Sequence, residues 1–99
     1  MVLPEDPIYR EMFPEFIASW KHDTDVRLLD IIKSSDTSEL YRFGHTLIGS
    51  GRQFGVESFA QIGKKIEECS RTNNWSAMSE IRSQLLAEIR LVESEFGSL

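Results

Sequence analysis

Apolar residues recur at intervals of three and four along most of the chain, and short polar stretches interrupt the pattern. Such intervals put the apolar side chains on one face of an α-helix. No stretch of more than a few residues alternates apolar and polar positions as a strand does. The pattern predicts four amphipathic helices: "PEFIASWKHDTDVRLLDIIKS" from Pro14, the stretch from Asp36 to Gly55, "VESFAQIGKKIEECSR" and "WSAMSEIRSQLLAEIRLVESEF".

The breaks between these helices carry residues that suit helix ends. Asp36, followed three residues later by Glu39, is typical of a capping box, and Gly55 suits a left-handed helix stop. Asn73 can take a positive φ, and Asn74 can act as the N-cap of the last helix. We therefore expect short connections between the helices.

Short connections make successive helices antiparallel neighbours. The sequence thus predicts an all-α fold, an antiparallel up-down-up-down four-helix bundle over residues 14–99. Pro4 and Pro7 predict a short irregular or helical N-terminal segment over residues 1–13, and Pro14 suits the first turn of the first helix. The apolar stripe of that helix consists of Phe16, Ile17, Trp20, Val26, Leu28, Ile31 and Ile32.

Composition narrows the class of protein. With 99 residues, 40% of them hydrophobic, the chain can form one domain with a modest core. The net charge of −5 argues against general binding to nucleic acid, which needs clustered Lys and Arg. Cys69 is the only cysteine, so the chain cannot form an internal disulfide, and a reducing compartment is the simpler interpretation.

The chain has no predicted membrane segment, because no apolar run approaches the roughly 20 residues that span a bilayer. The stretch "MVLPEDPIYR" lacks the apolar region of a signal peptide. We expect a soluble cytoplasmic protein with no membrane or nucleic-acid partner, and its well-charged polar faces favour a monomer. We expect no metal site, because the carboxylates are spread over solvent faces without a Glu-x-x-His pattern: Glu67, Glu68, Glu80, Glu88, Glu93 and Glu95.

The second helix carries a histidine opposite its predicted core face. At about 100° per residue, His45 points about 170° away from that face. Tyr41 lies one turn before His45 and Gly49 one turn after it, and Arg52 lies two turns on, all within a narrow angle. The core face consists of Leu40, Phe43, Leu47, Gly51 and Phe54.

The position of Gly49 suggests that this face is used. A glycine inside a helix costs about 1 kcal/mol relative to alanine, and packing gives no reason for a small residue on the solvent side. A glycine there removes a Cβ next to the imidazole, so that the backbone of a partner can approach. The alternative interpretation is an ordinary surface histidine in a helix that happens to contain glycines.

The stretch from His45 to Gly51, "HTLIGSG", followed by Phe54 and Gly55, resembles the histidine phosphotransfer (HPt) domain. In that family a helical His is followed by Lys at +3, Gly at +4 and often Ser at +5, and the resemblance covers roughly residues 14–95. It implies an HPt-like four-helix bundle and phosphoryl transfer between receiver-domain aspartates in a multistep two-component phosphorelay. The implied partners are response-regulator receiver domains and a hybrid sensor histidine kinase. The implied Mg²⁺ is bound by the receiver, and this chain needs no cofactor of its own.

One position departs from the family pattern, because Ile48 stands where the family has Lys. That lysine helps to hold the phosphoryl group, so Arg52 or Arg42 would have to supply the positive charge. Ile48 itself could serve partner docking, since receivers meet HPt surfaces largely through apolar contacts. Other polar residues could hydrogen-bond the phosphoryl oxygens or the imidazole: Ser50, Thr46, Gln53 and Gln61.

The chemistry expected of His45 is nucleophilic. A neutral imidazole can attack the phosphorus of a phospho-aspartate and form a P–N bond. The chain lacks the G-x-x-x-x-G-K-[ST] loop that binds ATP phosphates, so no ATP-dependent kinase activity of its own is expected. Two alternatives remain: a phosphate-free HPt-like interaction module that docks a receiver or kinase domain, and a helical bundle with no role in signalling.

Overall fold

The first helix begins earlier than the sequence predicts. In the computed structural model, which describes residues 6–97, α1 (Pro7–His22) starts at Asp6, whose carboxylate accepts a hydrogen bond from the Ile8 amide at 2.9 Å. Pro14 therefore lies inside α1 and not in its first turn. The expected boundary between residues 13 and 14 falls within this helix, where Phe13 is fully buried. Residues 1–5 of the expected N-terminal segment lie outside the described residues.

A π-helical turn, η1 (Asp23–Arg27), joins α1 to α2 (Leu28–Ser34) without interrupting the rod. In such a turn the backbone amides reach carbonyls five residues back, so the side chains that follow are rotated relative to an α-helix. As a result Thr24 is fully buried. Val26 was predicted to belong to the apolar stripe, but it is 48% exposed, so that prediction is wrong.

The π-helical turn is held by a side chain from the last helix, α5 (Met78–Gly97). The Arg82 guanidinium donates to the carbonyl of Thr24 at 3.0 Å and to that of Asp25 at 3.1 Å. These two contacts tie the first rod to α5. The Thr24 hydroxyl has no hydrogen-bond partner within the described residues.

The predicted helix ends are confirmed for α3 (Thr37–Gln53) and for the residues after α3 and α4 (Glu57–Thr72). Asp36 accepts a hydrogen bond from the Glu39 amide at 3.1 Å. The predicted capping box is only half formed, because the Asp36 amide donates to the Ile31 carbonyl and the Glu39 carboxylate pairs with Arg42. Gly55 and Asn73 take left-handed conformations, with φ of 75° and 54°.

The start of α5 differs from the prediction. Residues 75–77 form a turn, and α5 begins at Met78 instead of Trp75. Asn74 is therefore not the N-cap of α5. Its side chain instead accepts a hydrogen bond from the Ser76 hydroxyl at 2.9 Å.

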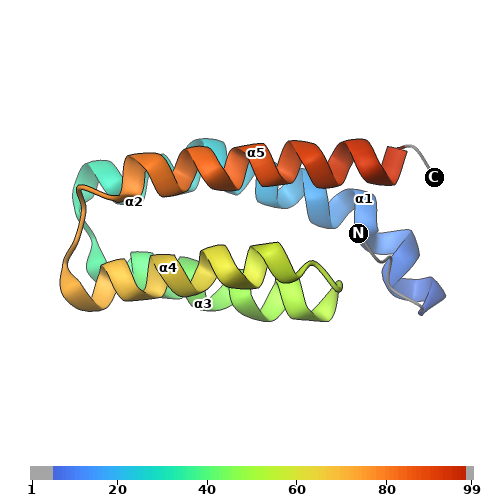
Figure 1. Cartoon of the computed structure of the whole chain (residues 1–99), viewed down its shortest axis with the longest axis horizontal. Helices are drawn as coiled ribbons and strands as arrows, with labels where there is room; N and C mark the ends of the chain where they lie inside the picture. Colours follow the sequence, from blue (N-terminus) through green and yellow to red (C-terminus); the bar gives the residue numbers. More distant parts are fainter. Residues whose placement is uncertain (1–5, 98–99) are drawn as a thin grey trace.

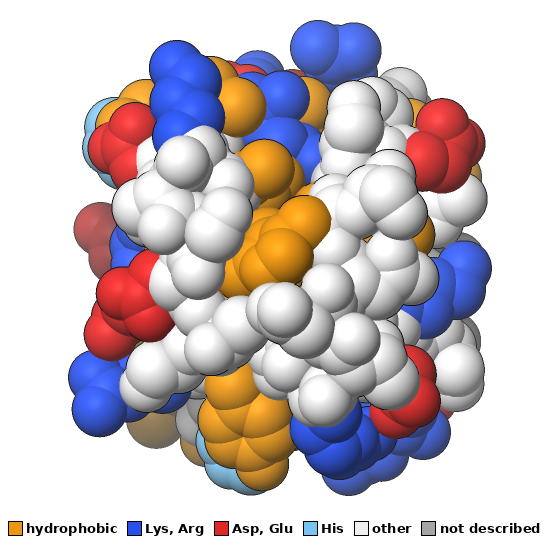
Figure 2. Space-filling view, turned by 90° about the vertical axis from the view of Figure 1, so that its left-hand side faces the viewer, with side chains coloured by type: hydrophobic (Ala, Val, Ile, Leu, Met, Phe, Trp, Pro, Cys, Tyr) orange, Lys and Arg blue, Asp and Glu red, His pale blue; other side chains and the backbone are white. Residues whose placement is uncertain are grey.

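The predicted all-α, up-down-up-down four-helix bundle is confirmed. Figure 1 shows the rod of α1, η1 and α2 beside α5, with α3 and α4 forming the other pair. Each successive rod runs antiparallel to the one before it. Figure 2 views the end where α2 leads into α3 and α4 into α5, with hydrophobic side chains in the middle of a polar rim. Half-buried Trp75 and Ala77 pack against the core from these connections.

Aromatic rings fill the core between α1 and α3. Phe16 stacks on Phe54 with ring centroids 4.1 Å apart, and Trp20 meets Phe43 edge-on at 5.4 Å. Large rings between two helices keep the backbones apart. By contrast, glycines allow the backbones of α3 and α4 to come into contact. This contact sets the positions of the residues at the candidate site.

Candidate functional site

The candidate site is a row of residues on the outer face of α3, with His45 at its centre. The His45 side chain is 72% exposed, which confirms its predicted outward direction. The Tyr41 ring stacks on the imidazole, with centroids 5.9 Å apart and 12° between the planes. On the other side of His45, a Cβ added to Gly49 would meet no atom within 4 Å. The imidazole is thus covered by a ring on one side and open on the other.

A carboxylate from α4 holds one nitrogen of the imidazole. His45 Nδ1 lies 3.2 Å from Glu67 Oε2, and the Glu67 side chain is only 13% exposed. The prediction that Glu67 is one of the carboxylates on solvent faces is therefore wrong. An ionised carboxylate can only accept hydrogen bonds, so the proton lies on Nδ1 when the ring is neutral. Nε2 then carries the lone pair.

Two glycines explain why Glu67 comes so close to α3. A Cβ on Gly44 would lie 2.9 Å from the Gly63 carbonyl oxygen and 3.0 Å from the Glu67 amide nitrogen. A Cβ on Gly63 would lie 2.8 Å from the Gly44 carbonyl oxygen. Only residues without a Cβ allow this approach. The backbone contact sets Glu67 on α4 beside His45 on α3.

Ile48 is half-buried and lies against α4. Its Cγ1 occupies the space next to Gly63, where an added Cβ would come within 2.7 Å of it. The side chain therefore covers the α4 backbone and leaves only part of its surface exposed to solvent. Because Ile48 fills this space, a residue with a Cβ does not fit at position 63.

Two polar residues of α3 that the sequence suggests as partners of the phosphoryl group or the imidazole bind other groups. Arg42 donates to Glu39 at 3.0 Å. Gln53 donates to the Tyr9 hydroxyl at 3.1 Å, and its side chain thus turns towards α1.

Gln61 donates to Glu57 on its own helix at 3.0 Å and is not bonded to the imidazole. Arg52 is exposed and has no ion-pair partner among residues 6–97. Its position two turns from His45 corresponds to about 10 Å along the helix axis. The side chains that approach the imidazole are therefore Glu67 and Tyr41.

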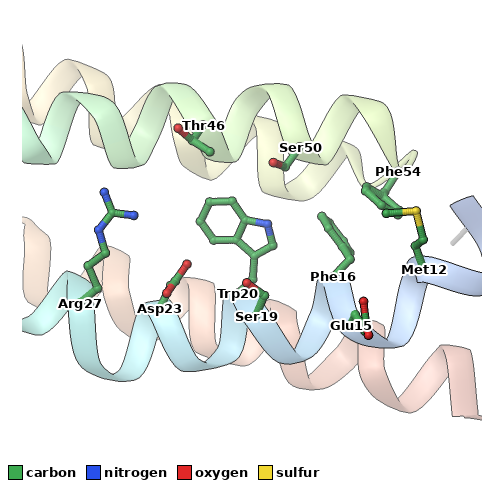
Figure 3. A pocket seen from close by; sticks show the side chains of 10 residues that line it. All are labelled: Met12, Glu15, Phe16, Ser19, Trp20, Asp23, Arg27, Thr46, Ser50 and Phe54. Carbon is green, nitrogen blue, oxygen red and sulfur yellow. The ribbon is translucent and has the colours of Figure 1, made fainter.

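Ser50 and Thr46 lie beside a groove between α3 and the α1–η1 segment. The groove has a volume of about 380 Å³, and Figure 3 shows both hydroxyl side chains on the α3 side, facing Trp20 and Phe16. Arg27 lies at one end of the groove, where its guanidinium pairs with Glu39 at 3.4 Å. The groove runs alongside the row that contains His45, and its lining is partly apolar.

Within residues 6–97, no group of three or more His, Cys, Asp or Glu side chains gathers closely enough to hold a metal ion. None of the helices described combines the length and the apolar composition needed to cross a membrane. Comparison of the chain with protein-family models, with curated proteins and with solved structures finds no match.

Proposed function

We propose that this protein is a histidine-containing phosphotransfer protein that relays a phosphoryl group between receiver-domain aspartates through His45. The observation that carries the proposal is the state of the imidazole. It is exposed, its Nδ1 is held by Glu67, and a glycine with open space around it lies one turn away. A nucleophilic nitrogen on an exposed side chain suits a donor that is itself a folded protein.

The proposed step uses the Nε2 lone pair. This nitrogen attacks the phosphorus of an aspartyl phosphate, the bond from phosphorus to the carboxyl oxygen breaks, and the aspartate leaves as a carboxylate. The product is a phospho-imidazolium that keeps its proton on Nδ1. The Glu67 carboxylate stabilises the positive charge that develops on the ring, and it does so from a position fixed before the reaction. The return transfer reverses these bond changes.

The proposed partners are response-regulator receiver domains and a hybrid sensor histidine kinase, all in the cytoplasm. The receiver supplies the Mg²⁺ that acts on the phosphoryl oxygens. The open surface at Gly49 lets the receiver backbone reach His45, and the groove beside Ser50 and Thr46 gives it an adjoining contact surface.

A phosphate-free interaction module is the second candidate function. The observation that favours it is Ile48, which packs over Gly63 and leaves no cation on α3 in the turn after His45, while Arg42 in the turn before is paired with Glu39. Such a module would bind a receiver or kinase through the same face without accepting phosphate.

The test is a transfer experiment with a labelled phospho-receiver and Mg²⁺. We expect label on the wild-type protein, lost in acid as phosphohistidine is, and none on His45→Gln. The matched control is His22→Gln, which changes the other exposed histidine, at the end of α1, and should accept label normally. Binding of several receivers without any transfer would instead establish the interaction module.

Glu67→Gln tests the role of the carboxylate. It replaces a charge-assisted hydrogen bond by a neutral one, a difference of about 1.4 kcal/mol, so transfer should slow about tenfold. Binding of the receiver should not change, because the Glu67 side chain is largely covered. An unchanged transfer rate would show that the contact with Nδ1 has no part in the reaction.

A further inference from the structure

A phosphoryl group on His45 would bring negative charge to a surface where α3 offers little to neutralise it. Ile48 is apolar and packs against Gly63, and the partly covered Glu67 carboxylate adds negative charge on the α4 side. Phosphoryl transfer relies on cations that stabilise the charge on the equatorial oxygens. A cation that is free to reach the phosphoryl oxygens is therefore needed near His45.

Two of the arginines near the row are already held by carboxylates. Arg42 pairs with Glu39 at 3.0 Å. Arg71 donates twice to Glu68, from Nε at 3.3 Å and from a terminal nitrogen at 2.8 Å. The hydrogen bond and the charge of Glu68 raise the pKa of Arg71. Recruiting either arginine would first break its existing pair.

Lys64 on α4 is exposed, and it has no hydrogen-bond or ion-pair partner in the part of the chain that the structure describes. Its neighbour Lys65 donates to Gln84 of α5 at 3.4 Å and so lies on another face of α4. An ammonium group on a flexible stem can move to a phosphate without losing an earlier contact. Lys64 is thus a cation that is free to bind.

The contacts between α3 and α4 place Lys64 next to the row of residues that contains His45. Gly63, the residue before it, touches Ile48, and Glu67, one turn after it, touches His45. Three residues along a helix correspond to about 4.5 Å of rise and about 60° of rotation. This rotation carries Lys64 away from the buried face of α4, formed by Phe59, Ile62 and Ile66, to the solvent side on which His45 lies.

We propose that Lys64 is the residue that binds the phosphoryl oxygens when His45 carries a phosphoryl group at Nε2. This inference rests on the proposed function. Lys64 takes the role expected of Arg52 or Arg42. Arg52 lies two turns along α3 and Arg42 is paired with Glu39, while Lys64 flanks the residues that contact His45 and Ile48 directly. The ammonium group makes no bond to phosphorus, and it screens the charge that develops as the phosphoryl group arrives.

The test compares Lys64→Gln with the matched control Lys65→Gln. Each protein is phosphorylated in two ways: by a phospho-receiver with Mg²⁺, and by phosphoramidate, which releases ammonia as its phosphoryl group moves to the imidazole. We expect Lys64→Gln to slow both reactions about tenfold and Lys64→Arg to restore most of the rate. Lys65→Gln should react like the wild type. Equal midpoints of urea unfolding would show that the fold is unchanged.

A second readout depends on charge and not on rate. The ³¹P signal of the phosphorylated protein titrates as the phosphoryl group gains its second negative charge. A nearby ammonium favours the dianion, so Lys64→Gln should move this titration to higher pH, while Lys65→Gln should leave it in place. A merely structural role would not shift it.

The outcomes separate this inference from the function on which it rests. A wild-type protein that takes label from neither donor would overturn the proposed function. A wild-type protein that takes label, with Lys64→Gln equal to Lys65→Gln in both rate and titration, would overturn only the role of Lys64. In the same series, slowing by Arg52→Gln alone would assign the cation to Arg52 and likewise overturn it.

Discussion

Gly49 should reduce the stability of the protein, and replacing it with alanine should reveal by how much. The residue lies inside α3 on the solvent side, and a Cβ there would meet no atom within 4 Å. Nothing therefore opposes the ordinary advantage of alanine in a helix, about 1 kcal/mol. We expect Gly49→Ala to raise the free energy of unfolding by about that amount, or Tm by about 4–8 °C for a domain of this size.

The matched control is Gly63→Ala, the same change in the neighbouring helix. A Cβ there would lie 2.8 Å from the Gly44 carbonyl oxygen and 2.7 Å from Ile48 Cγ1. The backbone atom cannot rotate away, so α3 and α4 must separate, and overpacking of this kind costs about 1–3 kcal/mol. The two substitutions should therefore change stability in opposite directions, although both exchange a helical glycine for the best helix former.

The assay is urea unfolding followed by the far-ultraviolet circular dichroism of the helices. Both variants should keep the wild-type slope of free energy against urea, with midpoints on opposite sides of the wild-type value. A Gly49→Ala protein less stable than the wild type would refute the claim that this side of α3 is open. In the transfer assay, Gly49→Ala should accept phosphate more slowly from a receiver and at the normal rate from phosphoramidate. Only the receiver, as a folded protein, needs the space that a residue without a Cβ leaves next to His45.

Two further predictions concern buried groups. Thr24→Val removes a buried hydroxyl that lacks a partner among the described residues, while keeping its shape, so the free energy of unfolding should rise by about 1 kcal/mol, measured by urea unfolding. Burial, helped by the charge of Glu68, raises the pKa of the Cys69 thiol above its ordinary value. The stability that comes from the protonated thiol is present below that ordinary value and is lost as the pH rises towards the folded value. Urea unfolding at neutral and alkaline pH should therefore show a decline in the wild type that Cys69→Ala lacks.

The sequence predicts the number and order of the helices because their apolar faces are regular over many turns. It does not predict the π-helical turn, since the pattern from Trp20 to Leu28 can be read as an unbroken α-helix. In that reading Val26 is buried, whereas in the structure Thr24 takes the inner position. The start of α1 is missed for a related reason. Pro7 and Pro14 both suit a first turn, and the burial of Phe13, a tertiary contact, extends the helix back to Pro7.

The site is predictable as far as α3 alone determines it. The outward direction of His45 and the open side at Gly49 follow from helical rotation, and the structure confirms both. The contact with Glu67 depends on how far α3 and α4 approach each other, which no single helix encodes. The available signal was a glycine on each facing helix, Gly44 and Gly63. Pairing them would have indicated the close approach, and with it a carboxylate beside the histidine.

The backbone contact between Gly44 and Gly63 also decides at which step the conformational entropy of positioning His45 beside Glu67 is lost. Helices separated by long side chains can slide as those side chains change rotamer, whereas two touching backbones have no such freedom. The spacing between His45 and Glu67 is therefore set once, when the protein folds. In the proposed transfer, the donor would then meet an imidazole whose Nδ1 partner is already in place, so less ordering is left to the encounter.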